Sequence, residues 1–339
     1  MKIAIFAYSL KGCKCAERVI SFLAGEDIRA YTIERLNQPS FATIEKPSAD
    51  FYGRLFSWSD TMIFVGSCGI AVRQIASHVE NKCSDPAVIC IDELGKFVIP
   101  ILSGHIGGAN EMAVKLAKNL SSTPVITTAT DINNVFSVDT WARGQGLIIE
   151  NMDTAKTVSA AILENTIPVF SDFPIISDYP RGTVSGDSGE LGIYITCSKK
   201  SPYIKTLRLI PPILHLGIGC RKGVDEATVF KSVSCVLQDN DIDLRAVKCV
   251  ASIDLKSNER GLLEFCKKNN LDITFYTPQE LSSVPGSFTP SRFVKSVTGV
   301  DNVCERAALI NADKILVRKT AVNNVTIAIA MEKWEVSFE

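Results

Sequence analysis

The sequence has no long apolar run and no excess of charge of one sign. No apolar run approaches the roughly 18 residues that span a bilayer. The apolar stretch at 3–7 is also too short for the core of a signal peptide. Lys and Arg together number 36 and Asp and Glu 37, which gives a net charge of -1. We therefore expect a cytoplasmic protein that neither enters a membrane nor binds nucleic acid through bulk charge.

Histidine is scarce, and the usual nucleotide-binding loops are missing. The chain has 3 histidines, His78, His105 and His215, and it contains neither a G-x-G-x-x-G sequence nor a Walker loop. The 11 cysteines are an odd number without framework spacing, and no second cysteine pair accompanies Cys13 and Cys15. We therefore expect reduced thiols and no metal site on the protein itself.

The 339 residues leave room for roughly two or three domains. In residues 1–140, short apolar runs alternate with helical periodicity, which predicts a layered α/β domain. The predicted strands are 3–7, 62–65, 88–91, 98–102 and 125–128. Helices are predicted over 69–80, with Val72, Ile75, Ala76 and Val79 on one face, and over 109–120.

Two further segments follow. Residues 141–210 are rich in Pro, Gly, Ser and Asp, which predicts a small irregular or β-containing central region. Pro211 and Pro212 mark its end, because neither can continue a helix. Residues 211–339 alternate again, which predicts a three-layer α/β domain with a mixed sheet. Its predicted strands are 214–218, 247–253, 273–276, 315–318 and 325–330, and its helices 225–237, 259–268 and 302–310.

A glycine-rich turn around His105 is the densest candidate site. It follows the predicted strand 98–102 and opens the predicted helix 109–120, with Gly107 and Gly108 in the turn. A helix N-terminus presents unpaired N–H groups and a positive dipole end, which favour a carboxylate or phosphate. His105 would lie at the carboxyl edge of the sheet, where open α/β sheets bind ligands. A tight turn with a solvated histidine explains the same spacing equally well.

Polar side chains also accompany the other predicted strands of this domain. Asp92 and Glu93 end a predicted strand, which allows one of them to face the same edge as His105, where a carboxylate would orient the ring and raise its basicity. For Arg73, a solvent-facing cation is the alternative. The polar residues singled out around these strands are Arg73, Lys82, Asp92, Glu93, Thr128 and Asp131.

The third segment has a basic, glycine-rich turn directly after its first predicted strand. Arg221 and Lys222 lie in this turn, and a guanidinium can hold a carboxylate through two parallel hydrogen bonds. Lys256, Glu259 and Lys319 follow or end later elements. Each alone would be a surface charge, but together they predict one basic edge.

Long stretches of the sequence resemble one known family. Between Ser67 and Asp139 these are GIAVRQIA, DPAVICIDELGKFVIPILSGHIGGANEMA and PVITTATDINNVFSVD. In the third segment they are LGIGCRKG, ASIDLKSNERGLLEF, TGVDNVCERAAL and VTIAIA. The chain thus resembles the CbiG family of cobalt-precorrin-5A hydrolases over nearly its whole length, and its third segment also resembles the CobE proteins. The turn in KTAVNNVTIAIA is poorer in glycine than the family pattern, and we expect this to alter a hairpin only.

The resemblance implies a hydrolase of anaerobic cobalamin biosynthesis that acts on a carbon–carbon bond. Cobalt-precorrin-5A carries a δ-lactone made from the ring A acetate and the methylated meso carbon. Hydrolysis opens the lactone, the two-carbon fragment leaves as acetaldehyde, and cobalt-precorrin-5B forms. Because the tetrapyrrole substrate carries the cobalt, the resemblance implies no cofactor on the protein.

Lactone hydrolysis needs a general base and a donor for the developing oxyanion. His105 is the candidate base, and the N–H groups of Gly107 and Gly108 are the candidate donors. The candidate orienting carboxylates are Asp92, Glu93 and Glu111. The candidate substrate-binding residues, besides the two glycines, are Arg73, Lys82, Thr128, Asp131, Arg221, Lys222, Lys256, Glu259 and Lys319.

Other functions are compatible with the same features. A nucleotide-dependent enzyme on a Rossmann-like scaffold would bind NAD(P) or ATP, although the fingerprint is missing. A non-catalytic carrier would use the basic edges to hand tetrapyrrole intermediates to neighbouring enzymes of the pathway. Such a carrier would bind the precorrinoid without releasing acetaldehyde. A further alternative within the hydrolase hypothesis is that the cobalt polarises the substrate while the protein only binds and positions the tetrapyrrole.

Overall fold

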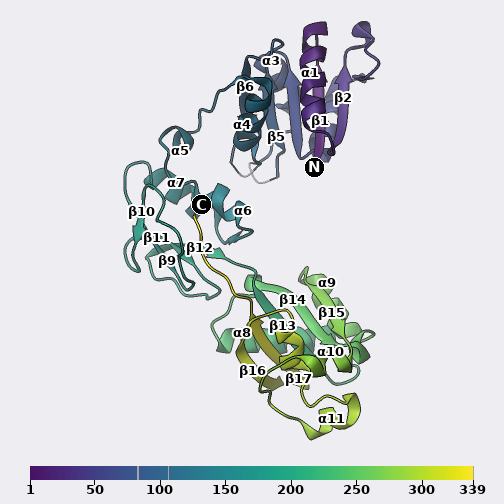
Figure 1. Cartoon of the computed structure of the whole chain (residues 1–339), viewed down its shortest axis with the longest axis vertical. Helices are drawn as coiled ribbons and strands as arrows, with labels where there is room; N and C mark the ends of the chain where they lie inside the picture. Colours follow the sequence, from purple (N-terminus) through teal and green to yellow (C-terminus); the bar gives the residue numbers. More distant parts are fainter. Residues whose placement is uncertain (82–83, 106, 339) are drawn as a thin grey trace. The chain divides into compact units, whose positions relative to one another are not determined.

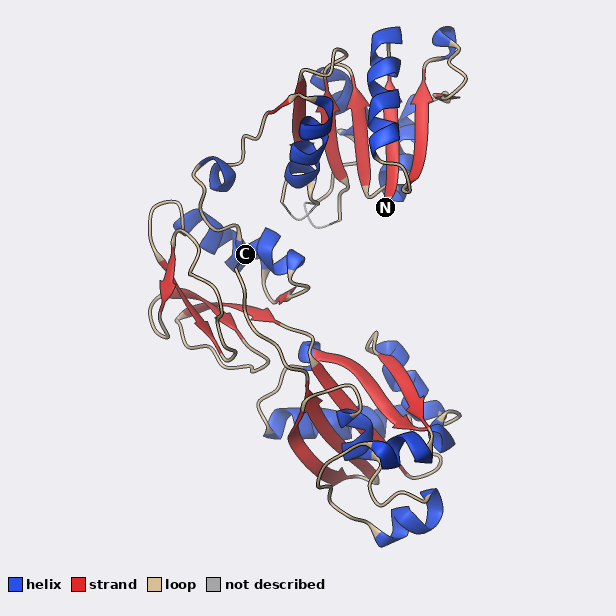
Figure 2. Ribbon diagram, in the orientation of Figure 1, coloured by secondary structure: helices blue, strands red, loops and turns tan. Residues whose placement is uncertain are grey.

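The computed structural model describes residues 1–81, 84–105 and 107–338. The chain divides into two compact units, Met1–Thr140 and Trp141–Glu339, drawn in Figures 1 and 2. Within the described residues, the strands form three sheets, and the predicted multi-domain α/β class is confirmed. None of the helices in this part of the chain is both long enough and apolar enough to cross a membrane.

The first unit is built on one sheet with helices on both faces. Its strands are β1 (Lys2–Ala7), β2 (Asp27–Thr32), β3 (Ala42–Thr43), β4 (Thr61–Val65), β5 (Ala87–Ile91), β6 (Phe97–Leu102) and β7 (Thr123–Pro124). Its helices are α1 (Leu10–Phe22), the short 3-10 turn η1 (Glu34–Leu36), α2 (Ser48–Trp58), α3 (Cys68–Ile75), α4 (Ala109–Leu120), α5 (Ala129–Ile132) and the start of α6 (Val138–Gly144). The strand order is β3-β2-β1-β4-β5-β6-β7.

Strand direction within this sheet changes once. The strands from β1 to β5 are parallel to one another. β6 then runs antiparallel to β5, and β7 follows the direction of β6. The C-terminal end of β6 therefore lies beside the N-terminal end of β5, with Leu102 opposite Val88.

Two apolar layers hold the first unit together. Ile3 and Ile5 of β1 belong to the layer that includes α1 and α4. Ala4 and Phe6 alternate with them and belong to the layer that includes α2 and α3. Because both faces of β1, β4 and β5 are covered, these three strands are almost continuous apolar runs in the sequence.

The strand predicted over 125–128 is wrong in position, because β7 already ends at Pro124. The N–H of Val125 still bonds to the carbonyl of Val98 at 2.8 Å. In a parallel ladder the next donor from β6 would be residue 100, and Pro100 has no N–H. The chain therefore leaves the sheet here.

The helix predicted over 69–80 is also shorter than expected. α3 ends at Ile75, and its buried face consists of Ala71 and Ile75. Val72 and Val79, which the periodicity assigned to the buried face, are 50% and 43% exposed. The helix predicted over 109–120 is confirmed as α4.

The central segment forms the first of two sheets in the second unit. Its elements are β8 (Ile148–Ile149), α7 (Met152–Ala161), β9 (Ile167–Ser171), β10 (Thr183–Ser185), β11 (Leu191–Ile195) and β12 (Lys205–Ile210). The strand order is β10-β9-β11-β12-β8, with only β8 antiparallel to its neighbour. Of the two alternatives, irregular or β-containing, the second is found.

The remaining residues form a mixed sheet flanked by helices (Figure 2). Its strands are β13 (Leu214–Cys220), β14 (Val247–Ile253), β15 (Asp272–Tyr276), β16 (Lys314–Val322) and β17 (Val325–Met331), in the order β15-β14-β13-β17-β16. Its helices are α8 (Glu226–Asp239), α9 (Arg260–Lys268), α10 (Pro278–Ser283), α11 (Arg292–Thr298) and α12 (Cys304–Leu309), with 3-10 turns η2 (Leu244–Ala246) and η3 (Asp254–Lys256). β17 is antiparallel to both of its neighbours.

Two local features of this sheet depend on residue type. A Cβ at Gly217 of β13 would lie 1.8 Å from the carbonyl oxygen of Cys304, so glycine lets α12 pack directly on the strand. The turn between β16 and β17 consists of Asn323 and Asn324, with φ of 46° and 66°. Asparagine tolerates this left-handed backbone, so the departure from a glycine-rich turn leaves the hairpin intact.

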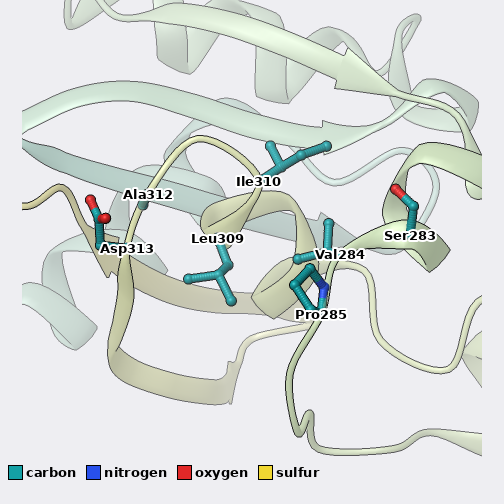
Figure 3. A pocket seen from close by; sticks show the side chains of 7 residues that line it. All are labelled: Ser283, Val284, Pro285, Leu309, Ile310, Ala312 and Asp313. Atoms are coloured by element: carbon teal, nitrogen blue, oxygen red, sulfur yellow. The ribbon is translucent and has the colours of Figure 1, made fainter.

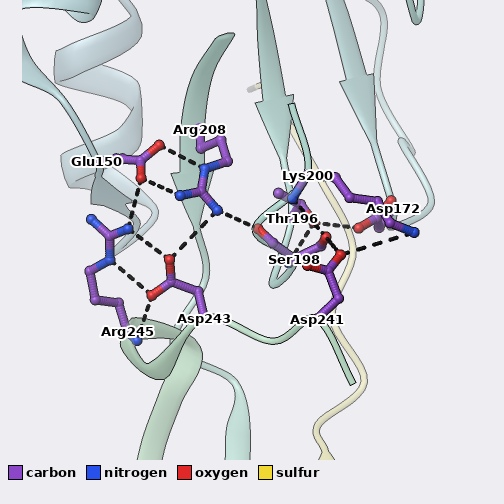
Figure 4. A network of polar contacts seen from close by, with 9 residues as sticks. All are labelled: Glu150, Asp172, Thr196, Ser198, Lys200, Arg208, Asp241, Asp243 and Arg245. Atoms are coloured by element: carbon purple, nitrogen blue, oxygen red, sulfur yellow. Dashed lines mark hydrogen bonds and ion pairs between the residues drawn. The ribbon is translucent and has the colours of Figure 1, made fainter. Parts of the chain in front are cut away.

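An ion network joins the two sheets of the second unit (Figure 4). Arg208 of β12 donates from Nε to Glu150 at 2.7 Å and from Nη1 to the carbonyl of Ser198 at 2.6 Å. Arg245 of η2 donates to Glu150 at 2.9 Å and to Asp243 at 2.7 Å. The side chains of Arg208 and Asp243 are only 9% and 7% exposed. Each of these buried charges therefore has an opposite charge beside it, as burial requires.

The segment after β17 returns to the central segment. Val336 forms a parallel bridge with Ile175. The indole N–H of Trp141 donates to the carbonyl of Ser337 at 2.8 Å, and the N–H of Phe338 donates to Ser177 at 2.8 Å. Residues far apart in the sequence thus complete the same layer.

Candidate functional site

The His105 turn lies at the edge of the first sheet where β5 begins. Because β6 is antiparallel to β5, residues that follow Leu102 come next to those that precede Ala87. Ser103 accordingly donates from Oγ to the carbonyl of Asp85 at 3.0 Å. The expectation that His105 lies at the carboxyl edge of the parallel strands is therefore wrong. That expectation assumed that β6 runs parallel to β5, whereas β6 is antiparallel and ends at the opposite edge.

The backbone of the His105 turn is tight and forms hydrogen bonds within the turn. A Cβ at Gly107 would lie 2.3 Å from Cβ of Ser103, and Gly108 has a φ of 80°, so both positions need glycine. The N–H of Gly108 donates to the carbonyl of His105 at 2.9 Å, and that of Ala109 to Ser103 at 3.1 Å. These donors of the α4 N-terminus are already used, which contradicts the prediction that Gly108 binds an oxyanion. Residue 106 lies outside the described residues.

Two carboxylates contact the ring of His105, one at each nitrogen. Nε2 lies 3.0 Å from Oδ2 of Asp131, and Nδ1 lies 3.4 Å from Oδ1 of Asp139. The side chain of Asp131 is 38% exposed, whereas that of Asp139 is 6% exposed. Hydroxyls accompany each carboxylate, Thr130 at 3.2 Å from Nε2 and Ser137 at 3.3 Å from Nδ1. The ring therefore bridges a buried and a solvent-facing carboxylate.

This geometry favours the charged imidazolium form of the ring. A neutral imidazole has one N–H and can donate to only one of two carboxylates, whereas imidazolium donates to both. The hydrogen bond with Asp139 raises the pKa of His105, burial opposes the rise, and the hydrogen bond with Asp131 adds to it. Asp139 raises the pKa of His105 more than Asp131 does, although it lies farther from the ring, because a buried charge is less screened by water.

The supporting contacts come from α4 and from the loops around α5. Asn110 of α4 donates from Nδ2 to Thr128 at 2.9 Å and to Asp131 at 2.8 Å. Asp139 accepts the N–H of Thr140 at 3.0 Å. Thr128 and Asp131 are thus close to His105, as the sequence suggested. The residues that sequence analysis missed are Asn110, Thr130, Ser137 and Asp139.

Asp92 and Glu93 do not orient His105, which corrects that prediction. They follow the C-terminal end of β5, while the His105 turn lies beside its N-terminal end. Asp92 accepts the N–H groups of its own turn, including that of Phe97 at 2.6 Å. Glu93 accepts the hydroxyl of Ser9 at 2.7 Å. Both carboxylates therefore stabilise the connection at the opposite edge of the sheet.

The other candidates of the first unit are also separated from the ring or undescribed. Glu111 forms an ion pair with Lys115 at 2.7 Å on the exposed side of α4. Arg73 is an exposed residue of α3, the helix that begins where β4 ends, at the edge opposite to His105. Lys82 lies outside the described residues.

The charged turn of the second unit is partly neutralised by Glu259. Glu259 accepts Nζ of Lys256 at 2.9 Å and the N–H of Gly223 at 3.0 Å. Burial opposes the charge on Glu259, but these two hydrogen bonds and the charge of Lys222 outweigh it and lower its pKa. Lys222 and Arg221 are exposed. The positive charge at this edge of the sheet therefore comes from Arg221 and Lys222.

Lys319 lies apart from this turn. It belongs to β16, which β17 separates from β13. Its N–H donates to Oε1 of the buried Glu305 at 2.8 Å. The structure therefore brings Arg221, Lys222, Lys256 and Glu259 together and leaves Lys319 in a different position.

Two family descriptions match the chain. "Cobalamin synthesis G N-terminal" matches residues 50–131, and "Cobalamin synthesis G C-terminus" matches residues 214–330. The matched ranges contain His105 and Asp131 in the first unit and the Arg221 turn in the second.

The chain is similar to two proteins named cobalt-precorrin-5A hydrolase. It is 32% identical to the protein from Priestia megaterium over 299 residues, which cover 82% of this chain and 80% of that protein. It is 30% identical to the protein from Salmonella typhimurium over 344 residues, which cover 97% of each. The crystal structure of CobE, a protein from the cobalamin (vitamin B12) biosynthetic pathway, is 28% identical with a TM-score of 0.34, over 35% of this chain and 89% of CobE.

Proposed function

Because the chain belongs to the cobalamin synthesis G (CbiG) family, we propose that it is a cobalt-precorrin-5A hydrolase. The observation that carries this function is the identity of 30% to the Salmonella typhimurium hydrolase over 97% of both chains. The substrate is then a tetrapyrrole, which brings its own cobalt, and the protein supplies binding and proton transfer. The product is cobalt-precorrin-5B with release of acetaldehyde.

We place the proton chemistry at His105. Water that adds to the lactone carbonyl must lose a proton, and the oxygen that leaves as the ring opens must gain one. Asp131 is the more exposed of the two carboxylates, so it is the group that accepts the proton of water. His105, held as imidazolium, donates the proton to the leaving oxygen. This reverses the base role first assigned to His105.

Asp139 is a positioning residue in this scheme. It contacts Nδ1, the nitrogen that faces away from Asp131, and its side chain is almost fully buried. A buried carboxylate at Nδ1 fixes the ring orientation and stabilises its positive charge, so Nε2–H, on the more exposed side beside Asp131, is the proton that His105 donates. Asn110 holds Asp131 and Thr128 in the same arrangement.

The acetate and propionate groups of the tetrapyrrole need cationic partners. Arg221 and Lys222 are the described residues best suited to this role, because both are exposed beside a glycine-rich turn. Lys256 is less available, since it already pairs with Glu259. Replacing Arg221 should weaken substrate binding with little effect on the chemical step.

Acetaldehyde release from cobalt-precorrin-5A under anaerobic conditions tests the function. We expect the purified chain to release one acetaldehyde for each cobalt-precorrin-5B formed. Binding of the substrate without release would instead identify a non-catalytic carrier that serves neighbouring enzymes. Absence of both binding and release would contradict the hydrolase assignment altogether.

A further inference from the structure

Three reactive side chains meet on the sheet of the C-terminal segment, away from the sites described above. His215 lies in β13, Cys249 in β14, and Glu332 directly follows β17. His215 and Cys249 are opposite each other in the strand register, so their side chains project from the same face. Sγ of Cys249 lies 3.1 Å from Nδ1 of His215, and Nε2 of His215 lies 2.7 Å from Oε1 of Glu332.

The order of these groups is that of a nucleophile, a base and an orienting carboxylate. Glu332 accepts from Nε2, which places the ring proton on that nitrogen and leaves Nδ1 free to accept the thiol proton. Burial opposes the charge on Glu332, but hydrogen bonds from Lys248 at 2.7 Å and from His215 outweigh it and lower its pKa. The carboxylate therefore stays ionised and can stabilise an imidazolium at His215.

The surroundings of Cys249 decide how its thiol would react. Burial raises the pKa of Cys249; Lys248 opposes this rise, and Glu332 and Asp272 add to it. The thiol of Cys249 is therefore protonated at neutral pH, so the thiolate is not present before the reaction begins. Attack on an electrophile then requires a base to remove the proton during the step, and His215 occupies that position.

A cavity of about 410 Å³ lies beside the segment that leads into β16 (Figure 3). Asp313, one of its lining residues, bonds through its N–H to the carbonyl of Met331 at 3.0 Å, next to Glu332 in the chain. Its volume is in the range of small-ligand sites. Its lining residues are Ser283, Val284, Pro285, Leu309, Ile310, Ala312 and Asp313.

Tyr276 links the cavity to the thiol. Asn311, which lies between the lining residues Ile310 and Ala312, donates to the hydroxyl of Tyr276 at 2.7 Å. Burial and the charge of a Cys249 thiolate raise the pKa of Tyr276. Tyr276 packs against the apolar cluster that includes Ala251 and Ile253, which share a face of β14 with Cys249, so the cavity borders the face of the sheet that carries the thiol.

We propose that Cys249, His215 and Glu332 form a second nucleophilic site, which accepts the acyl group of a small ester. As sulfur bonds to the carbonyl carbon, the thiol proton passes to Nδ1 of His215. The tetrahedral intermediate expels the alcohol, which takes the proton from His215, and Cys249 is left as a thioester. Water then hydrolyses the thioester, releasing the acid and restoring the thiol. The step requires no oxidant or metal and is independent of the hydrolase function.

Acetylation by p-nitrophenyl acetate tests this site. The full chain is treated briefly at neutral pH, nitrophenolate release is followed, and peptide mass spectrometry locates the acetyl group. We expect the label on Cys249 in preference to Cys235, a thiol that has a carboxylate 3.5 Å away but contacts no histidine in any described hydrogen bond. This comparison uses the wild-type chain alone. Equal labelling of the two thiols, or no acetylation, would overturn the proposal.

Variants then show whether Cys249 reacts because His215 acts as its base or only because its thiol is accessible. His215→Gln should slow acetylation of Cys249 by about 100-fold, the range for loss of a general base. Glu332→Gln, which keeps a hydrogen-bond acceptor but removes the charge, should cause a smaller loss. Cys235→Ser is the matched control and should leave the rate at Cys249 unchanged. An unchanged rate in both His215→Gln and Glu332→Gln, with folding verified by circular dichroism, would show that the histidine does not act as a base.

Discussion

Nδ1 of His105 lies 3.4 Å from the buried carboxylate of Asp139, and this contact sets the character of the candidate active site. The ring would otherwise be free to shed its proton near neutral pH. With a buried negative charge on one nitrogen and Asp131 on the other, His105 is suited to hold and donate a proton. The resemblance of the sequence to the CbiG family is confirmed by the relatives, while the roles of these residues remain predictions.

Replacement of His105 by alanine should reduce acetaldehyde release by about 100-fold or more, because a positioned acid or base contributes that much. The measurement is the single-turnover rate with cobalt-precorrin-5A. His78→Ala is the matched control, since His78 lies elsewhere in the first unit, beside Gly53 and Phe56. A loss below threefold in His105→Ala would exclude His105 from the chemical step.

Asp139→Asn should lower the pKa of His105, because it removes the less screened of the two negative charges on the ring. Asp131→Asn should lower it less. Proton NMR of the His105 ring through a pH titration measures both effects. Glu111→Gln serves as the control, since Glu111 pairs with Lys115 on the exposed side of α4. A His105 pKa that is the same in Asp139→Asn and wild type would contradict the positioning role.

The raised pKa of His105 also predicts how stability varies with pH. The charged ring stabilises the folded state fully below the unfolded histidine pKa of about 6.5. This contribution is lost as the pH rises through the higher, folded-state value. Urea unfolding at a series of pH values should therefore show a difference between wild type and His105→Ala that shrinks across this window. A difference that grows with pH would mean that the ring is held neutral.

Arg208→Met should destabilise the second unit by up to about 3–5 kcal/mol, the usual cost of removing one partner of a buried ion pair. The substitution keeps an apolar stem but removes the buried guanidinium, so Glu150 and Asp243 keep only Arg245 as a cationic partner. Lys205→Met, on the exposed part of the same strand, should change the free energy of unfolding by less than about 0.5 kcal/mol. Chemical denaturation compares the two. Equal effects would show that the network contributes little.

Gly217→Ala should destabilise the fold by about 1–3 kcal/mol or more, because the added methyl group meets the backbone of α12. Gly144→Ala is the control, since a Cβ there meets nothing within 4 Å. Thermal unfolding should separate the two variants clearly. If Gly217→Ala unfolds at the wild-type temperature, α12 must be able to move away from β13.

The elements predicted best are those whose bounds depend only on their own residues and immediate neighbours in the sequence. α4 was predicted at its observed bounds, because its apolar residues repeat at helical spacing and a glycine turn precedes it. β14 was likewise predicted at its observed bounds, Val247–Ile253. β7 was misplaced, because its end depends on Pro100 in a neighbouring strand, which a pattern within residues 125–128 does not contain.

The candidate site was predicted in part for the same reason. His105 stood out through its glycine neighbours, and Asp131 through its place after an apolar run. Asp139 follows His105 by 34 positions, and no spacing rule connects them. The pairing of His105 with Asp92 and Glu93 failed because it depended on strand direction, and apolar runs do not reveal that β6 reverses.

The return of the chain's last segment to the central layer has a consequence for synthesis. The N–H of Phe338 donates to Ser177, which lies 161 positions earlier in the chain. A ribosome that adds about 5–20 residues per second needs roughly 10–30 s between making these two residues. During that interval the loop around Ile175 has emerged while its partner Val336 does not yet exist. Nascent chains should therefore expose this edge to proteases and chaperones until the segment around Val336 has been made.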